Sequence, residues 1–377
     1  MPDQLETLSR TVIESIHRTV HTAWLGCLQC APRAGAKTAF PSTANAASLG
    51  PAIASVSFFL TVTTLLRAEL SPLHGLLVEQ KQATASAVAP GDHVRKLTVD
   101  GLERSCVIHV PPGLHPTEPA PLVLVLHGAA MNARMMQGFS GMNAQADAAK
   151  FIAVYPNGTG LAGAFLTWNS GGLGPARKKP DDVSFLRALL DDLAGILQVD
   201  PRRTYAAGMS NGAMMCYRLA AEMPDRIAAI AAVGGTLAMN DPRPSRAVPL
   251  IHFHGTDDRV VPYAGPHNQN SSATSFKSVP ETIATWVKLT SCWPSPLIRE
   301  VPDRFPDSTT VRVSTYGPGR AGAEVVLVDI IGGGHTWPGQ QPAVSLIGKS
   351  TREISANRMI WDFFQKHPLP APEKAGN

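Results

Sequence analysis

The sequence predicts an α/β fold with a mainly parallel central sheet and helices on both faces. Three observations support this prediction: strand and helix patterns alternate from Lys96 to His367, the strand patterns are nearly continuous apolar runs, and glycine and proline are abundant, with 32 residues of each in 377. Repeated strand–helix units place neighbouring strands parallel, and strands covered on both faces are apolar throughout. In such sheets, the chemistry lies at the carboxyl ends of the strands.

Composition excludes several classes of protein. With 44% hydrophobic and 16% charged residues, the bulk of the chain is not disordered by charge. The formal net charge of +4 is too small for a nucleic-acid-binding protein, so we expect no nucleic-acid partner. Cys27 and Cys30 form a C-x-x-C with no second pair and no histidine at zinc-finger spacing, so no zinc site is expected there. The remaining cysteines are predicted to be buried free thiols: Cys106, Cys216 and Cys292.

The chain divides into an N-terminal extension (1–90), a larger domain (91–367) and a tail (368–377) that is predicted to be disordered. Residues 5–20 have the spacing of an amphipathic helix. Residues 52–66 (AIASVSFFLTVTTLL) are the most hydrophobic stretch, and three interpretations stay open for them: an export signal, a signal anchor or a docked helix. The first would make the protein extracellular or periplasmic, the second would associate it with a membrane, and the third leaves a cytoplasmic location open.

The elements of the larger domain follow one another in a regular order. It begins with a hairpin, and a glycine-rich loop through Gly174 follows the fourth strand. The predicted strands are Lys96–Asp100, Ser105–Val110, Pro121–His127, Phe151–Tyr155, Arg203–Ala207, Ile227–Val233, Leu250–Phe253 and Val325–Ile330. The predicted helices are Asp182–Gln198, Asn211–Met223, Val279–Leu289 and Thr351–Gln365.

A G-x-S-x-G motif, Gly208–Gly212, lies directly after the strand that ends at Ala207 and directly before a helix. Strand, turn and helix are the context that this motif requires, because the turn is sharp, its flanking residues must be small, and the serine is presented at the helix N-terminus. A serine that merely caps the helix is the alternative. We predict that Ser210 is a nucleophile.

A serine hydroxyl needs a histidine to take its proton and an acid to orient that histidine. In this topology the acid follows the serine along the chain, and the histidine comes last. Asp257 and Asp258 lie just past the strand Leu250–Phe253, where a carboxylate is well placed. Asp258 is the predicted acid and Asp257 the alternative, while an Asx turn would explain either one without catalysis.

A metal site at the end of the same strand is less favoured. His252 and His254 alternate within the strand and have no second cluster of ligands elsewhere, so neither a metal nor another cofactor is expected.

Three later histidines are candidates for the base: His267, His335 and His367. His267 lies in a polar loop and His367 at the start of the proline-rich tail. His335 follows a strand and three glycines, which allow its imidazole to reach over the sheet edge. We therefore predict that His335 is the base.

Two backbone N–H groups near Ser210 must bind the oxyanion. One belongs to Asn211, the residue after the nucleophile, and the other to the loop after the strand that ends in His127-Gly128. Ala129 is the preferred donor in that loop and Ala130 the second choice. His127 is expected to shape the loop rather than to act in catalysis.

With these residues assembled, residues 94–364 resemble the polyhydroxybutyrate depolymerase and feruloyl esterase family of α/β hydrolases. The matching stretches, in order, are PLVLVLHG (121–128), GMNAQAD (141–147), YPNG (155–158), Trp168-Asn169, DDVSFL (181–186), GMSNGAMM (208–215), HGTDDRVVPY (254–263) and GGGHTWPG (332–339). The resemblance implies Ser210 as nucleophile, His335 as base, and Asp258 rather than Asp257 as acid.

The resemblance also implies an activity: cofactor-free hydrolysis of carboxylic esters, by a family whose members are commonly exported. The implied substrates are hydroxyalkanoate polymers or oligomers, or feruloyl and acetyl esters of plant polysaccharide. Trp168 and Trp337 are candidates for lining an acyl or aromatic pocket, with core packing as the alternative. A serine peptidase of the same fold, and a non-catalytic protein anchored in the cell envelope, are the competing functions.

The chain departs from the family at its cysteines. Gly171–Leu173 and Gly317-Pro318 stand where the family often has cysteines, so Cys292 is expected to lack its usual partner. This departure weakens the argument for oxidative export. Ala129 also stands where a cysteine is common, a change that a backbone donor tolerates.

Overall fold

The computed structural model describes residues 88–371, except for 116, 162–163, 172–179, 267–275 and 342–344. All of them belong to one compact unit, Leu76–Asn377. The predicted amphipathic helix and the apolar stretch 52–66 lie outside the described residues. Within the described part, no helix combines the length and the apolar character needed to cross a membrane.

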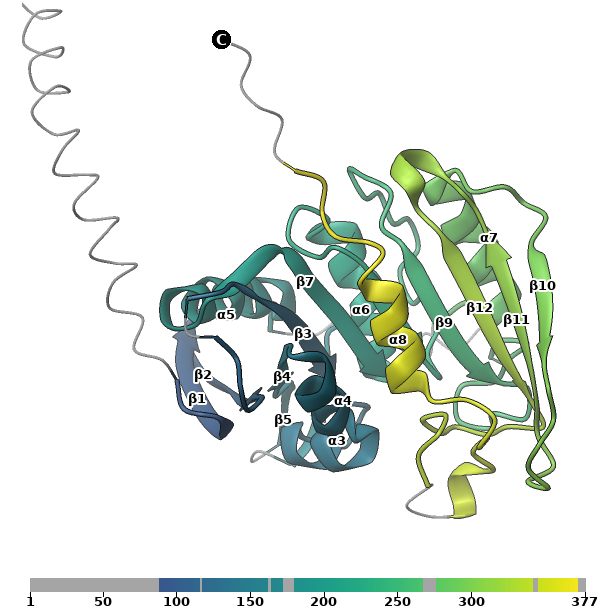
Figure 1. Cartoon of the computed structure of the whole chain (residues 1–377), viewed down its shortest axis with the longest axis horizontal. Helices are drawn as coiled ribbons and strands as arrows, with labels where there is room; N and C mark the ends of the chain where they lie inside the picture. Colours follow the sequence, from purple (N-terminus) through teal and green to yellow (C-terminus); the bar gives the residue numbers. More distant parts are fainter. Residues whose placement is uncertain are drawn as a thin grey trace, which may run out of the picture. The chain divides into compact units, whose positions relative to one another are not determined.

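Within the described residues, ten strands form one sheet whose central members are parallel (Figure 1). Parallel pairing runs from β4 to β12, and antiparallel strands extend the sheet at both edges. Their order in space is β1 (Gly91–Val99), β2 (Leu102–Val110), β4 (Ile152–Pro156), β3 (Ala120–Leu126), β7 (Val199–Met209), β8 (Ile230–Val233), β9 (Leu250–Gly255), β12 (Val325–Ile331), β11 (Thr310–Tyr316) and β10 (Leu297–Val301).

Helices cover both faces of this sheet (Figure 1). One face packs against α5 (Asp182–Ile196), α6 (Asn211–Glu222) and α7 (Val279–Thr290). The other packs against α3 (Ala133–Ser140), α4 (Met142–Ala149) and α8 (Ala356–Phe364). The predicted α/β-hydrolase arrangement, a mainly parallel sheet between two helical layers, is confirmed.

Strand β3 illustrates how the sequence builds the two layers. Leu122, Leu124 and Leu126 belong to the core beneath the α5–α7 layer, whereas Val123 and Val125 belong to the core on the opposite face. Each fully buried side chain of this kind stabilises the fold by roughly 1.5–3 kcal/mol. A strand buried on both faces must therefore be apolar at every position, as the LVLVL run is.

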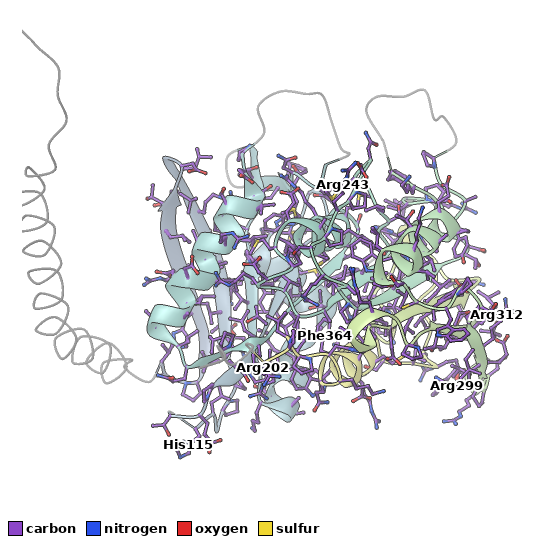
Figure 2. All side chains as sticks on the ribbon, turned by 90° about the horizontal axis from the view of Figure 1, so that it is seen from above. His115, Arg202, Arg243, Arg299, Arg312 and Phe364 are labelled. Atoms are coloured by element: carbon purple, nitrogen blue, oxygen red, sulfur yellow. The ribbon has the colours of Figure 1, made fainter. Side chains whose placement is uncertain are left out.

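The side chains follow the same division between interior and edge. Figure 2 shows Phe364 of α8 in the middle of the described part, and the structure buries it completely against Tyr205, with ring centroids 4.5 Å apart. Arg299 and Arg312, by contrast, lie on the edge strands β10 and β11 (Figure 2).

Several boundaries differ from the predicted ones. Strand β7 begins at Val199 rather than Arg203. Its first five residues are half-buried or exposed and mostly polar, so they have no apolar run that would predict a strand. Helix α8 begins at Ala356 rather than Thr351, because the Ser355 hydroxyl accepts the Arg358 N–H and caps it there. The predicted glycine-rich loop contains a short hairpin, β5 (Thr159–Leu161) with β6 (Ala164–Thr167).

The cysteines and the tail complete the fold. Cys106, Cys216 and Cys292 are buried free thiols, as predicted, and burial raises the pKa of Cys106 to about 12. A Cβ on Gly319 would lie 2.7 Å from the Cys292 sulfur, so the chain just after Gly317-Pro318 does approach this thiol. In the tail, Leu369 exchanges hydrogen bonds with Arg202, and residues 372–377 lie outside the described part.

Candidate active site

Ser210 lies on a sharp turn between β7 and α6. Its backbone is strained, with φ 56° and ψ −120°, a conformation that non-glycine residues rarely adopt. The glycines of the motif make the turn possible: a Cβ on Gly208 would collide with the Gly212 carbonyl, and one on Gly212 would collide with the Leu126 carbonyl. The predicted strand–turn–helix context is present, and Ser210 is held half-buried at the helix N-terminus.

Asp258 and His335 are brought together by the loops after β9 and β12. The His335 Nδ1 lies 2.7 Å from Asp258 Oδ2, and the Asp258 side chain is completely buried. The other oxygen, Oδ1, accepts the backbone N–H groups of Val260 and Val261, each at 2.8 Å. Asp257, the alternative acid, is exposed, and among the described residues its side chain accepts only the Thr256 hydroxyl. The geometry thus selects Asp258 as the partner of the imidazole.

Backbone hydrogen bonds join the two loops to each other. Thr256 and Asp257 donate their N–H groups to the Ile330 and Gly333 carbonyls, each at 2.9 Å. A Cβ on Gly255 would collide with the Gly333 carbonyl, so this approach requires glycine. The His335 N–H donates to the Ile347 carbonyl at 2.7 Å. Asp258 and His335 therefore lie on one hydrogen-bonded unit made of two loops.

Strand β8 places Ser210 beside that unit. The Ser210 N–H donates to the Val233 carbonyl at 2.8 Å, and the next residue, Gly234, packs on the imidazole: a Cβ there would lie 3.2 Å from His335 Nδ1. The three predicted residues meet at the carboxyl edge of the parallel strands. No hydrogen bond links the Ser210 hydroxyl to His335 among these described side chains, a contact that often tightens only when substrate binds.

The two amides predicted to bind the oxyanion have no acceptor among the described residues. The amides of Ala129 and Asn211 donate no hydrogen bond within the described part of the chain, and that of Asn211 is at the helix N-terminus. Ala130, the second choice, instead donates its N–H to the Leu166 carbonyl at 2.9 Å. A Cβ on Gly128 would lie 3.4 Å from the Ser210 Cβ, so this loop borders the serine.

His127 fixes the same loop through two hydrogen bonds of its ring. Its Nε2 accepts the Gly158 N–H at 2.9 Å, so the proton is on Nδ1, which donates to the Gly128 carbonyl at 2.8 Å. Burial lowers the pKa of His127 to about 4, which keeps the ring neutral and this tautomer fixed. The expectation that His127 shapes the loop agrees with this geometry.

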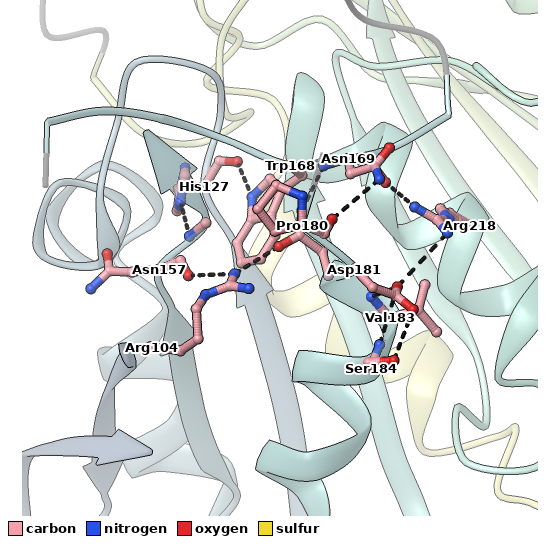
Figure 3. A network of polar contacts seen from close by, with 12 residues as sticks. Arg104, His127, Asn157, Trp168, Asn169, Pro180, Asp181, Val183, Ser184 and Arg218 are labelled. Atoms are coloured by element: carbon pink, nitrogen blue, oxygen red, sulfur yellow. Dashed lines mark hydrogen bonds and ion pairs between the residues drawn. The ribbon is translucent and has the colours of Figure 1, made fainter. Parts of the chain in front are cut away.

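A buried ion pair anchors the surrounding loops (Figure 3). Arg104 donates to Asp182 at 2.7 Å and to the Asn157 carbonyl at 3.2 Å, while Asp182 also accepts the Asn169 N–H at 2.6 Å. Both charged side chains are at most 3% exposed. The sequence does not predict this pair, because Arg104 belongs to no recognisable motif and lies 78 residues from its partner.

Trp168 and Trp337 occupy the interior instead of the surface. Each is 1% exposed, and each indole N–H has a protein acceptor: the His127 carbonyl at 3.0 Å and Asn357 Oδ1 at 2.7 Å. Their positions fit the alternative of core packing, not the predicted contact with substrate. The Asn211 side chain also acts structurally, since its Oδ1 accepts the Trp168 N–H at 2.6 Å.

No cluster of ligands able to hold a metal ion is found in the described ranges. His252 and His254 instead hydrogen-bond to neighbours within the core. His367 is buried beside Glu324 at 3.1 Å, and His267 lies outside the described residues. Among the described histidines after Asp258, only His335 meets a buried carboxylate at the carboxyl edge of the parallel strands.

Comparisons with known proteins identify the family. Residues 104–265 match the family model described as "Esterase PHB depolymerase". A putative esterase, NocK, of Nocardia uniformis subsp. tsuyamanensis is 33% identical over 71% of this chain and 81% of its own length. The chain belongs to this esterase family. It is therefore related to carboxylic ester hydrolases, as the resemblance implied.

Two further relatives carry more specific names. Feruloyl esterase B of Piromyces equi is 27% identical over 71% of this esterase chain and 46% of its own length. Poly(3-hydroxyalkanoate) depolymerase C of Paucimonas lemoignei is 26% identical over 45% of the chain and 46% of its own length. The chain spans less than half of each of these two relatives.

Proposed function

We propose that this esterase hydrolyses carboxylic esters through Ser210, His335 and Asp258. The observation that carries the proposal is the buried Asp258–His335 pair at 2.7 Å, placed near a strained serine and near two amides that have no acceptor among the described residues. A carboxylate that orients an imidazole, a nucleophile and an oxyanion site are together the parts that acyl transfer needs.

The proposed reaction has two steps. The Ser210 Oγ attacks the ester carbonyl carbon while His335 Nε2 takes the hydroxyl proton, and Asp258 stabilises the imidazolium through Nδ1–H. The Ala129 and Asn211 amides bind the oxyanion, each donor lowering the barrier by about 3 kcal/mol. The imidazolium then gives its proton to the leaving alcohol. A water molecule, deprotonated by His335, then attacks the acyl-enzyme. The bond between the acyl carbon and Ser210 Oγ breaks, the imidazolium returns its proton to Oγ, and the carboxylic acid leaves.

For the substrate we propose a hydroxyalkanoate polyester or its oligomers, on the strength of the matched family and of the depolymerase relative. Feruloyl esters of plant polysaccharide are the second candidate, favoured by the relative that aligns over 71% of the chain. The two candidates differ in the acid that is released, an aliphatic hydroxy acid or an aromatic cinnamate.

The test is an assay of the full chain on nitrophenyl acetate and butyrate, methyl ferulate and hydroxybutyrate oligomers, with Ser210→Ala beside the wild type. We expect hydrolysis of the nitrophenyl esters and of one of the two specific substrates, and a loss of at least about 1,000-fold in kcat for Ser210→Ala. Cleavage of an aminoacyl nitroanilide in place of all these esters would support a peptidase. Full activity of Ser210→Ala would refute the proposed mechanism.

A further inference from the structure

Three buried polar side chains form a chain of contacts behind Asp258. The Tyr217 hydroxyl lies 2.7 Å from His252 Nδ1, and His252 Nε2 lies 3.2 Å from His254 Nδ1. His254 Nε2 then lies 2.8 Å from the Val261 carbonyl. All three side chains are at most 1% exposed, and the two imidazoles stack with ring centroids 5.3 Å apart. The proposed reaction uses none of them.

The hydrogen bonds of this chain run in one direction. A carbonyl oxygen can only accept, so His254 Nε2 carries a proton and donates it to Val261. Burial lowers the pKa of both imidazoles, and although the Asp258 carboxylate opposes this shift at His254, both rings are neutral at neutral pH. His254 Nδ1 therefore accepts from His252 Nε2–H, and His252 Nδ1 accepts from the Tyr217 hydroxyl, whose pKa burial raises. Every donor points toward the Asp258 loop.

The chain ends on the turn that holds the acid. Val261 accepts from His254 through its carbonyl and donates its N–H to Asp258 Oδ1 at 2.8 Å. His254 Nε2 also lies 3.5 Å from Asp258 Oδ2, the oxygen that meets His335. One histidine therefore touches the turn on one side and faces the catalytic oxygen of the carboxylate on the other.

We propose that His254, oriented by His252 and Tyr217, is a positioning residue that fixes the Asp258 carboxylate against His335. This inference rests on the proposed function, since it concerns the same acid and base. The Tyr263 ring packs edge-on against His254, with 5.9 Å between the ring centroids. Its hydroxyl donates to Asp329 at 2.7 Å and so takes no part in the hydrogen bonds that join Tyr217, His252 and His254. The donors nearest Asp258 Oδ2 are then His335 and His254 alone among the described side chains.

Two substitutions at one position separate positioning from packing. His254→Leu removes the donor to Val261 and leaves an apolar side chain in its place. We expect kcat for nitrophenyl butyrate to fall by about 10- to 100-fold and KM to stay within about twofold of the wild type. A small displacement of a catalytic group costs that much in rate. His254→Gln keeps an N–H donor near the position of Nε2, and we expect it to restore at least half of the lost kcat on a logarithmic scale.

His109→Leu is the matched control. His109 is also a buried histidine with two side-chain partners, Asp92 at 2.8 Å and Asp147 at 2.9 Å, but it lies on β2, away from the candidate site. We expect this variant to lose stability and to keep the wild-type kcat. If His109→Leu loses kcat as His254→Leu does, or if His254→Leu keeps the wild-type kcat, the positioning role is refuted.

A second measurement does not depend on activity. The His335 Nδ1–H proton, shared with a buried carboxylate, should give a low-field proton resonance that is identified by its absence in His335→Ala. We expect His254→Gln and Tyr217→Phe, which preserve shape, to shift or broaden this resonance, and Ser210→Ala and His109→Leu to leave it in place. An unchanged resonance in both shape-preserving variants overturns the inference. An active Ser210→Ala overturns the proposed function instead, so the two failures are distinguishable.

Discussion

At the scale of single residues, the two oxygens of Asp258 have separate tasks. Oδ1 is tied to the backbone of its own turn, while Oδ2 faces the His335 ring. A carboxylate that is fixed through one oxygen can orient a partner through the other without rotating. The neighbouring Asp257 has no such arrangement, because it is exposed to solvent.

This division predicts opposite results for two neighbouring substitutions. Asp258→Asn keeps the size of the side chain but presents an amide to His335 and favours the wrong imidazole tautomer, so kcat should fall by about 1,000- to 10,000-fold. Asp257→Asn should stay within about twofold of the wild type. Steady-state kinetics on nitrophenyl butyrate measures the difference, and circular dichroism checks that both variants are folded. Equal losses in the two variants would contradict the assignment of the acid.

The lowered pKa of His127 predicts how the free energy of unfolding depends on pH. Its folded-state pKa of about 4 lies below the value of about 6.5 in the unfolded chain, so on acidification the unfolded state binds the proton first. Stability from this residue is therefore present above pH 6.5 and is lost between pH 6.5 and 4, by about 3 kcal/mol in total. His127→Gln lacks this titration, so urea denaturation should show its deficit relative to the wild type shrinking from pH 7 to pH 4. A deficit that is independent of pH would refute the assigned ionisation.

At the scale of elements, the turn that carries Ser210 depends on its glycines. A Cβ on Gly208 meets the backbone carbonyl of Gly212, which cannot move without displacing α6, whereas Gly195 in α5 has nothing within 4 Å of its own Cβ position. Gly208→Ala should therefore abolish activity or folding. Gly195→Ala should keep activity and stabilise the protein by up to about 1 kcal/mol, because alanine is the better helix former. Thermal melts and kinetics of the two variants test this contrast.

The sequence predicted those elements whose pattern is set by burial alone. Strand β3 is apolar at every position, β12 is apolar except for Asp329 and helices α5 and α6 are apolar at helical spacing, so the sequence predicts all four within a few residues. The β5–β6 hairpin is short and glycine-flanked, and β10 is largely exposed, so neither has an apolar period to detect.

The sequence predicts those residues of the candidate site that belong to a motif or follow a predicted strand. Ser210 has a motif with a steric requirement, and Asp258 and His335 follow strand ends in a fixed chain order. The sequence leaves Trp168 as either a pocket residue or a core residue, because an exposed and a buried indole look alike in a sequence; its burial and the acceptor for its N–H favour the core. His252 and His254 were recognised as a pair at alternate strand positions, yet their partner Tyr217 comes from a helix 35 residues earlier.

At the scale of the whole molecule, both cores and the candidate site are built by residues 88–371. Among the described residues, two large apolar clusters lie one on each face of the sheet. The compact unit that contains them begins at Leu76. A folding unit with its own core on both sides of a sheet can be expected to fold without further segments.

A chain that begins at Leu76 should therefore keep the esterase activity of the full protein. We expect its kcat/KM on nitrophenyl butyrate to lie within about threefold of the full chain and its melting temperature within a few degrees, because no residue proposed for catalysis or for positioning precedes Arg104. Ser210→Ala in the same shortened chain is the control that assigns the activity to the described site. A shortened chain that folds but loses activity would mean that residues before Leu76 contribute to catalysis, which would contradict this prediction.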